Sequence, residues 1–166
     1  MIVKSLRLAI LGLLIPLAAC NSDTTAKSVV ASSTSTTTKS ASTASQPIPQ
    51  SGGYSNIDNS KLQELIRKGV MVVDIRRKEE WQQTGIVEGS KTITFFDHTG
   101  RINPNFVPEF TAIANPDQPV ALICRTGNRT QAASQAIAQQ LGYKNVYNVT
   151  NGITGWIAEK RPVAVY

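Results

Sequence analysis

Apolar runs of strand length alternate with amphipathic stretches of helix length over residues 54–166. The runs predict five β-strands, because they are short, rich in β-branched and aromatic side chains, and bounded by turn residues. They cover residues 54–57, 70–75, 90–96, 120–123 and 146–149. Residues 54–57 are expected at an edge of the sheet, whereas the continuous apolar run 70–75 is typical of a strand that is buried on both faces.

Between these strands, apolar residues recur at the three- and four-residue spacing of amphipathic helices. The first helix should begin after a capping Asp58 or Asn59 and end at Gly69, and a longer helix should cover residues 130–141. The predicted pattern is an α/β fold with an open, five-stranded parallel sheet and helices on both faces. The helical side chains expected to face the core are Leu62, Leu65, Ile66, Trp81, Phe106, Val107, Phe110, Ile113, Ala133, Ile137, Leu141, Ile153, Trp156 and Ile157.

A lone cysteine stands where the strand 120–123 ends and the helix 130–141 begins. In open parallel sheets, ligands bind outside the carboxyl ends of the strands, and this loop lies at such an end. A helix N-terminus and nearby guanidinium groups both favour the thiolate, which is the nucleophilic form of cysteine. We therefore interpret the loop as the active site; it consists of Cys124, Arg125, Thr126, Gly127, Asn128, Arg129 and Thr130.

The backbone of this loop is suited to binding an anion. The first N–H groups of a helix lack intrahelical acceptors, and they can hold a thiolate, an oxyanion or a persulfide anion. Gly127 permits a positive φ or the close approach of a ligand. The alternative is a structural cysteine that is buried as a small hydrophobe, but the arginine, threonine and asparagine neighbours favour a reactive Cys124.

The single histidine, His98, falls in a loop predicted over residues 97–104. No second histidine or cysteine stands at ligand spacing from it, so the sequence predicts no metal site and no cofactor. A catalytic pair of Cys124 and His98 is an alternative. It is not needed, because the loop amides and arginines already account for activation of the sulfur without a base.

The N-terminal region has the pattern of a targeting segment. Lys4 and Arg7 precede an uncharged stretch over residues 8–19, which is too short to span a bilayer comfortably and is typical of a signal peptide. The sequence Leu-Ala-Ala-Cys that ends at Cys20 resembles a bacterial lipobox. We therefore expect residues 1–19 to be a lipoprotein signal peptide and Cys20 to be lipidated, the alternative being an ordinary secretory signal.

Residues 20–53 are expected to be a disordered linker that follows the lipid anchor. Serine and threonine make up 15 of the 25 residues from 21 to 45, and such a composition cannot bury a core. The folded domain is then expected over residues 54–166. This organisation predicts a membrane-anchored, periplasm-facing protein of the bacterial cell envelope, and Asn21 after the lipidated cysteine favours the outer membrane.

Cysteine count and charge narrow the chemistry further. If Cys20 is acylated, Cys124 is the only other cysteine and no intrachain disulfide can form. The formal net charge is +6, and loss of Lys4 and Arg7 with a signal peptide leaves +4. This basicity suits an anionic substrate or a lipid surface, but the absence of a dense Lys/Arg cluster argues against a nucleic-acid partner.

Four segments in order resemble the rhodanese-domain sulfurtransferases. The loop 124–130 resembles the active-site loop of that family, and residues 72–76 resemble its strand that ends in Asp-x-Arg, here Asp74 and Arg76. Residues 79–90 resemble its helix and Gly-His-Ile-Pro-Gly-Ala turn, and residues 146–156 resemble its last strand and the helix that starts Gly-Gly-Ile-x-x-Trp. The resemblance covers about residues 54–166 and implies the rhodanese-like α/β fold.

Three positions depart from the family pattern. Ile86 and Glu88 stand where the turn has histidine and proline, and Asn151 stands where the last motif has its first glycine. All three lie in turns and not in the cysteine loop. Arg76 is expected to form an ion pair with Glu79 or Glu80, the alternative being contact with substrate.

The resemblance also implies a reaction. Four residues separate Cys124 from Arg129, as in the sulfurtransferases, whereas the related phosphatases and arsenate reductases have one residue more. We therefore expect a monomeric enzyme that moves a sulfane sulfur from an anionic donor such as thiosulfate, through a Cys124 persulfide, to cyanide or a thiol. Arg125 and Arg129 are expected to meet the released oxyanion. A non-catalytic persulfide relay, and a cysteine-dependent phosphatase or arsenate reductase, are the alternatives.

Overall fold

The computed structural model describes residues 44–166 of the 166-residue chain. The expected signal peptide, the lipidated Cys20 and residues 20–43 of the linker lie outside the described residues. No helix within residues 44–166 has both the length and the apolar character that crossing a membrane requires.

A six-stranded sheet forms the centre of the described part of the chain, with the strand order β1-β2-β6-β5-β3-β4. All neighbouring pairs from β2 to β4 are parallel, as the alternation of strands and helices predicts, and only β1 is antiparallel. The strands are β1 (Ile48–Pro49), β2 (Ser55–Ile57), β3 (Met71–Asp74), β4 (Lys91–Thr92), β5 (Val120–Ile123) and β6 (Val146–Val149).

The predicted number of five strands was wrong, because the segment expected to be linker adds a sixth. Its strand β1 pairs with β2 through a tight hairpin, in which Gln50 N–H donates to the carbonyl of Tyr54 at 2.8 Å. Two residues that include a proline carry no periodic signal, although proline is tolerated in an edge strand. As a result β1, and not β2, forms this edge of the sheet.

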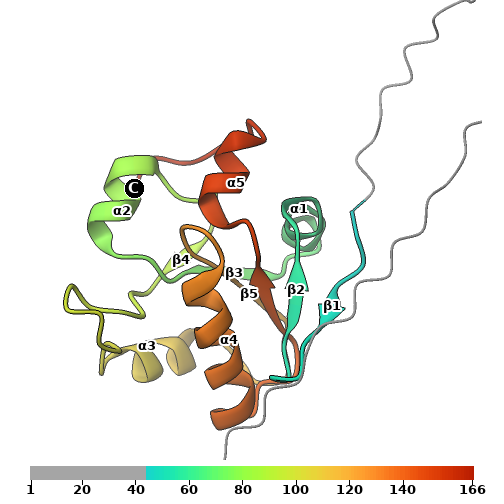
Figure 1. Ribbon diagram of the computed structural model, residues 1–166, viewed down its shortest axis with the longest axis vertical. Helices are drawn as coiled ribbons and strands as arrows, with labels where there is room; N and C mark the ends of the chain where they lie inside the picture. The colour runs from blue at the N-terminus through green and yellow to red at the C-terminus, as the bar shows by residue number, and fades with distance from the viewer. Residues whose placement is uncertain (1–43) are drawn as a thin grey trace, which may run out of the picture. The chain divides into compact units, whose positions relative to one another are not determined.

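Helices cover both faces of the sheet, as predicted (Figure 1). Along β5, Val120 and Leu122 contribute to one hydrophobic cluster, and the alternate residues Ala121 and Ile123 contribute to the other. The first cluster includes residues of α3 and α4, and the second includes residues of α1 and α5. The helices are α1 (Asn59–Arg67), α2 (Lys78–Thr84), α3 (Phe106–Ile113), α4 (Asn128–Gln140) and α5 (Gly152–Ala158).

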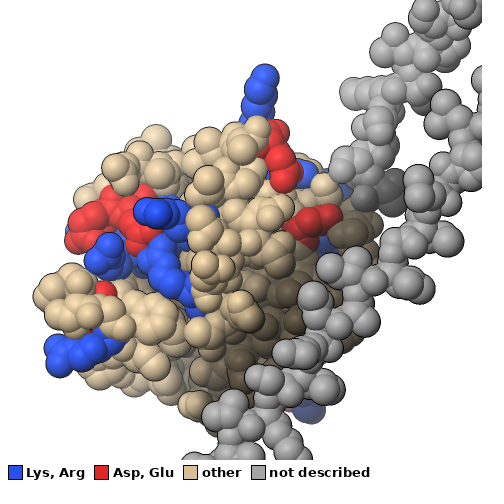
Figure 2. All heavy atoms as spheres, in the orientation of Figure 1, with Lys and Arg blue, Asp and Glu red and all other residues tan. Residues whose placement is uncertain are grey.

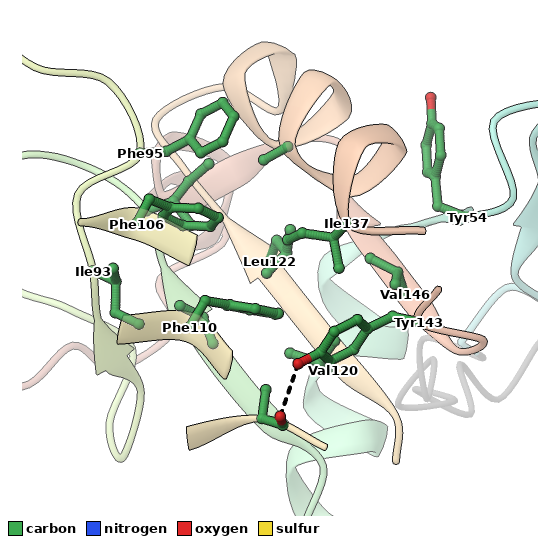
Figure 3. Close-up of a cluster of buried hydrophobic side chains, with 14 of the residues drawn as sticks. Tyr54, Ile93, Phe95, Phe106, Phe110, Val120, Leu122, Ile137, Tyr143 and Val146 are labelled. Carbon is green, nitrogen blue, oxygen red and sulfur yellow. Dashed lines mark hydrogen bonds between the residues drawn. The ribbon is translucent and has the colours of Figure 1, made fainter. Parts of the chain in front are cut away.

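Figure 3 shows the first cluster, in which Phe106 and Phe110 of α3 and Ile137 of α4 pack around Leu122 of β5. The two phenylalanine rings are stacked, with their centroids 5.5 Å apart. The hydroxyl of Tyr143 donates to the carbonyl of Ala114 at 2.8 Å, so the one polar atom of this buried ring has a partner.

Several predicted boundaries and faces differ from the structure. The strand predicted over residues 90–96 is reduced to β4, although Ile93 N–H still bonds to the carbonyl of Asp74. Asp58, one of the two predicted caps, does cap α1 by accepting from Lys61 N–H at 2.7 Å. Three of the expected core residues are instead exposed, because they lie on helix positions that belong to neither hydrophobic cluster; they are Val107, Ile113 and Ile157.

A buried ion pair closes the end of β3 next to the cysteine loop. Asp74 and Arg76 have 0% and 1% of their side-chain surface exposed, and Arg76 Nη2 lies 2.7 Å from Asp74 Oδ2. Arg76 Nε also donates to Asp74 Oδ1 at 2.9 Å, which makes the contact bidentate. Asp74 pairs in register with Ile123, the residue before Cys124.

The remaining donors of Arg76 hold α2. Its Nη1 donates to Thr84 Oγ1 at 2.7 Å and to the carbonyl of Glu80 at 3.1 Å, and its Nη2 donates to the carbonyl of Gly85 at 2.7 Å. The predicted ion pair of Arg76 with the carboxylate of Glu79 or Glu80 was therefore wrong. A guanidinium with five donors can bind a carboxylate and a helix end together. Within residues 44–166 its ion-pair partner is Asp74.

Replacing Arg76 by methionine should lower the free energy of unfolding by about 3–5 kcal/mol, because it leaves the carboxylate of Asp74 buried without a partner. Urea denaturation followed by circular dichroism measures this loss. The double variant Asp74→Asn/Arg76→Met should recover part of it, since no uncompensated charge then remains. A single variant as stable as the wild type would show that the pair does not hold β3 and α2 together.

Candidate active site

Cys124 follows β5 directly, and α4 begins four residues later at Asn128. Its side chain is 1% exposed, yet the sulfur is not surrounded by hydrocarbon alone. Gly127 N–H donates to Sγ at 3.2 Å, and the hydroxyl oxygen of Thr130 lies 3.5 Å from it. The sulfur thus rests at the N-terminus of α4, where a helix favours negative charge.

The start of α5 fixes the backbone of the cysteine loop. Ile153 N–H donates to the carbonyl of Cys124 at 2.8 Å, and Thr154 N–H donates to the carbonyl of Arg125 at 3.1 Å. In Figure 1 the loop lies at the upper end of α4, between α2 and α5. Two otherwise unpaired N–H groups of α5 therefore hold the two carbonyls that follow the sulfur-bearing residue.

Two glycines allow this close packing. A Cβ atom on Gly127, whose φ is +94°, would lie 2.2 Å from the carbonyl oxygen of Thr150. A Cβ on Gly152, with φ +55°, would lie 2.5 Å from the carbonyl oxygens of both Cys124 and Arg125. Both positions therefore require glycine, for space as well as for backbone conformation.

Arg129 forms a bidentate ion pair with Glu80 of α2. Its Nη1 and Nη2 lie 2.7 Å and 2.6 Å from the two carboxylate oxygens. Glu80 Oε2 also accepts from Arg77 N–H at 3.2 Å, which caps α2. Sequence reasoning did not identify Glu80 as a partner of the cysteine loop; its only local signal was an acidic residue in the first turn of a helix.

The pair affects the charge state of both groups. Burial opposes ionisation of Glu80, but hydrogen bonds from Arg129 and from the Arg77 N–H outweigh it and lower the pKa of Glu80 to about 2. The hydrogen bond to Glu80 raises the pKa of Arg129, and the nearby sulfur of Cys124 raises it further. Both side chains therefore remain charged at neutral pH.

An open pocket of about 520 Å³ lies beside the loop. Arg125, Thr126 and Arg129 line it from the loop, and Glu80 lines it from α2. The residues between β4 and α3 form another wall, which includes His98. Within residues 44–166 the structure shows no hydrogen bond between His98 and Cys124, and no group of acidic, histidine and cysteine side chains that could hold a metal ion.

The structure thus gathers some of the predicted site residues and separates others. Cys124, Gly127 and Thr130 meet at the sulfur, while Arg125 and Thr126 face the pocket. Asp74 and Arg76 are in the neighbouring strand end and bind each other and α2, as described above. Asn128 is the first residue of α4.

A sequence model of the rhodanese-like domain matches residues 58–159, which is more than half of the chain. The chain belongs to the rhodanese-like domain family. The fold and family expected from the sequence are thereby confirmed.

Two relatives illustrate the sequence similarity of this rhodanese-like domain to other proteins. An uncharacterized protein of Rickettsia prowazekii is 34% identical over 95 residues, which cover 55% of this chain and 75% of the relative. The thiosulfate sulfurtransferase GlpE of Pseudomonas aeruginosa is 29% identical over 103 residues, which cover 62% of this chain and 84% of the enzyme. The second of these relatives supports a role within the sulfurtransferase family.

Solved structures agree on the fold. A rhodanese-related protein from Thermoplasma volcanium is 32% identical and has a TM-score of 0.53, covering 67% of this chain and 98% of that protein. A protein from M. tuberculosis with a TM-score of 0.58 is 24% identical and covers 67% of this chain and 97% of its own length. At that identity, the second likeness concerns the fold alone.

Replacing Gly127 by alanine should displace the cysteine loop from α5, because the new Cβ would overlap the carbonyl of Thr150. We expect a loss of stability of roughly 2–4 kcal/mol, combining the backbone strain with the overlap, measured by urea denaturation. Gly89→Ala is the matched control, since Gly89 also has a positive φ of +76° but no atom within 4 Å of the added Cβ. Equal losses in the two variants would contradict close packing at Gly127.

The Glu80–Arg129 pair should make stability depend on acid pH. The pKa of Glu80 is lowered from 4.5 to about 2 on folding, so its contribution is complete above about pH 5 and is lost as the pH falls toward 2. The destabilisation caused by Glu80→Gln in urea denaturation should therefore shrink over that interval. Glu79→Gln, one residue earlier in α2 and not bound to Arg129, is the control. An undiminished effect of Glu80→Gln at low pH would contradict this assignment.

Proposed function

We propose that this rhodanese-like protein is a sulfurtransferase that carries sulfur as a persulfide on Cys124. The observation that carries the proposal is the position of the Cys124 sulfur, which lies at the N-terminus of α4 with Gly127 N–H at 3.2 Å and Thr130 Oγ1 at 3.5 Å. These are partners for an anionic sulfur. The GlpE relative, a thiosulfate sulfurtransferase by name, supports the same reaction class.

The first half of the proposed reaction loads the enzyme. The Cys124 thiolate attacks the outer sulfur of thiosulfate, and a new S–S bond forms on the protein. The S–S bond of thiosulfate breaks, and sulfite leaves with the bonding electron pair. The product is a Cys124 persulfide anion, which the N–H groups at the start of α4 stabilise as they stabilise the thiolate.

The second half returns the enzyme to its starting state. Cyanide or a thiolate attacks the outer sulfur of the persulfide, and the Cys124 thiolate leaves with the electron pair. The cycle is a double displacement with a covalent intermediate. No step needs an external oxidant or reductant, because each step is a displacement at sulfur in which the bonding electron pair leaves with the displaced nucleophile.

The proposal extends to the location of the protein. We propose that Cys20 carries the lipid anchor, that the Ser/Thr-rich segment separates the domain from the membrane, and that the domain acts as a monomer in the periplasm. The sequence at residues 1–20 supports this placement.

Mass spectrometry after incubation with thiosulfate tests the covalent step. We expect a gain of about 32 Da, the mass of one sulfur atom, on the peptide that contains Cys124, as a covalent carrier requires. Cyanide should remove this mass. The Cys124→Ser variant should gain nothing, and a gain elsewhere in the chain or none in the wild type would refute the proposal.

Steady-state turnover separates an enzyme from a relay. An enzyme should produce many equivalents of thiocyanate from thiosulfate and cyanide, and Cys124→Ser should abolish this production. A relay would load sulfur once and release it only to a specific protein. Turnover of an aryl phosphate in place of thiosulfate would instead assign the loop to phosphatase chemistry.

A further inference from the structure

Two arginines line the pocket from the cysteine loop, and the structure gives them different surroundings. Arg129 has its two terminal nitrogens bound to the two oxygens of Glu80 at 2.7 Å and 2.6 Å. For Arg125, the structure shows no ion pair or side-chain hydrogen bond within residues 44–166. Its backbone carbonyl is nevertheless fixed by the N–H of Thr154. Arg125 thus combines a held backbone with a side chain that is exposed and available to a ligand.

The geometry of the Glu80–Arg129 contact resembles that of a bound oxyanion. A guanidinium fork binds a carboxylate and a tetrahedral oxyanion in the same way, through two parallel N–H···O bonds. The two parallel N–H bonds that Nη1 and Nη2 of Arg129 give to Glu80 are therefore not available to a second anion. Glu80 has only 15% of its side chain exposed and also caps α2, so it is held in place independently of Arg129.

The other acidic residue of the pocket does not neutralise Arg125. Asp97 Oδ1 accepts from the N–H groups of Thr99 and Arg101, at 2.8 Å and 3.0 Å, and from the hydroxyl of Thr99 at 2.6 Å. Its carboxylate is therefore bound within its own turn. Figure 2 shows Lys and Arg side chains beside Asp and Glu side chains over the part of the surface where α2 lies.

We infer that Glu80 is a built-in anion that removes Arg129 from oxyanion binding, so that the anionic end of the sulfur donor is bound by Arg125 at the rim of the pocket. This inference rests on the proposed function and changes its details. Sequence reasoning assigned the oxyanion to Arg125 and Arg129 together, whereas of these two loop arginines only Arg125 has no ion pair within residues 44–166. Glu80 then acts as a specificity determinant, because a phosphate or arsenate ion needs the fork that Glu80 occupies.

The inference can be tested without sulfur transfer, by comparing an anionic and a neutral alkylating reagent of almost equal size. The reaction rates of iodoacetate and iodoacetamide with Cys124 in the full chain are measured by mass spectrometry of the peptide that contains Cys124. Arg125→Gln should lower the ratio of the iodoacetate rate to the iodoacetamide rate about tenfold, which is the effect of losing one charge-assisted hydrogen bond. An unchanged ratio would overturn the role of Arg125.

The role of Glu80 is tested by how well inorganic phosphate protects Cys124 from alkylation. In Glu80→Gln the fork of Arg129 becomes available, so phosphate should protect Cys124 from iodoacetamide at about tenfold lower concentration than in the wild type. If the same phosphate concentration protects Cys124 in both proteins, the proposed role of Glu80 is overturned. If Glu80→Gln does not fold, as thermal melting would reveal, the Arg125→Gln ratio still decides whether the anion site is at Arg125.

Arg67→Gln is the matched control in both measurements, because it removes the same charge from α1, outside the residues that line the pocket. Its alkylation rates and its protection by phosphate should equal those of the wild type. A shift as large as that of Arg125→Gln would attribute the effect to net charge and overturn the inference.

Thiosulfate loading of the same variants connects the result to the reaction. If Cys124 loads no sulfur in any variant, the proposed function fails while the alkylation rates still decide the anion site.

Discussion

The active-site loop depends on one close contact, the packing of its backbone against the start of α5. Two N–H groups of α5 hold the carbonyls of Cys124 and Arg125, and this is possible only because Gly127 and Gly152 lack a Cβ atom. The contact leaves the N–H of Gly127 directed at the sulfur. A sulfur site built from backbone in this way is rigid, because moving any part of it would break bonds at a helix terminus.

A second set of contacts places α2 against this loop. Arg76 binds Asp74 at the end of β3 and three acceptors in or next to α2, and Glu80 of α2 then reaches Arg129 of α4. A buried pair of this kind is not in itself a source of stability, since desolvation offsets its Coulomb energy. Here the pair fixes the position of α2, and the carboxylate of Glu80 occupies the terminal nitrogens of Arg129. In the proposed anion site, specificity for the sulfur donor would originate in residues that lie about 50 positions before the loop.

The burial of Cys124 fits this chemistry. A thiol with 1% of its surface exposed meets few reagents, and a persulfide held on the same side chain is shielded from unwanted thiols. Access then depends on the pocket beside the loop, whose walls come from α2, the loop and the residues before α3. The proposed anion-binding role of Arg125 at its rim would bring a charged donor to a sulfur atom that is otherwise enclosed.

The sequence by itself determined the parallel sheet with helices on both faces, the position of Cys124 at a strand end and the family, because strand and helix periods and the loop are local patterns. Only the tertiary structure decided the pairing of Glu80 with Arg129, the partner of Arg76 and the sixth strand β1. The physical reason is that each of these contacts depends on which groups the packed backbone brings within hydrogen-bonding distance, and local sequence patterns do not specify that. Asp74, Glu79 and Glu80 all stand near Arg76 in the sequence, whereas the acid nearest to Arg129 is Asp117, 12 residues before it. Only the packed backbone brings Asp74 to Arg76 and Glu80 to Arg129.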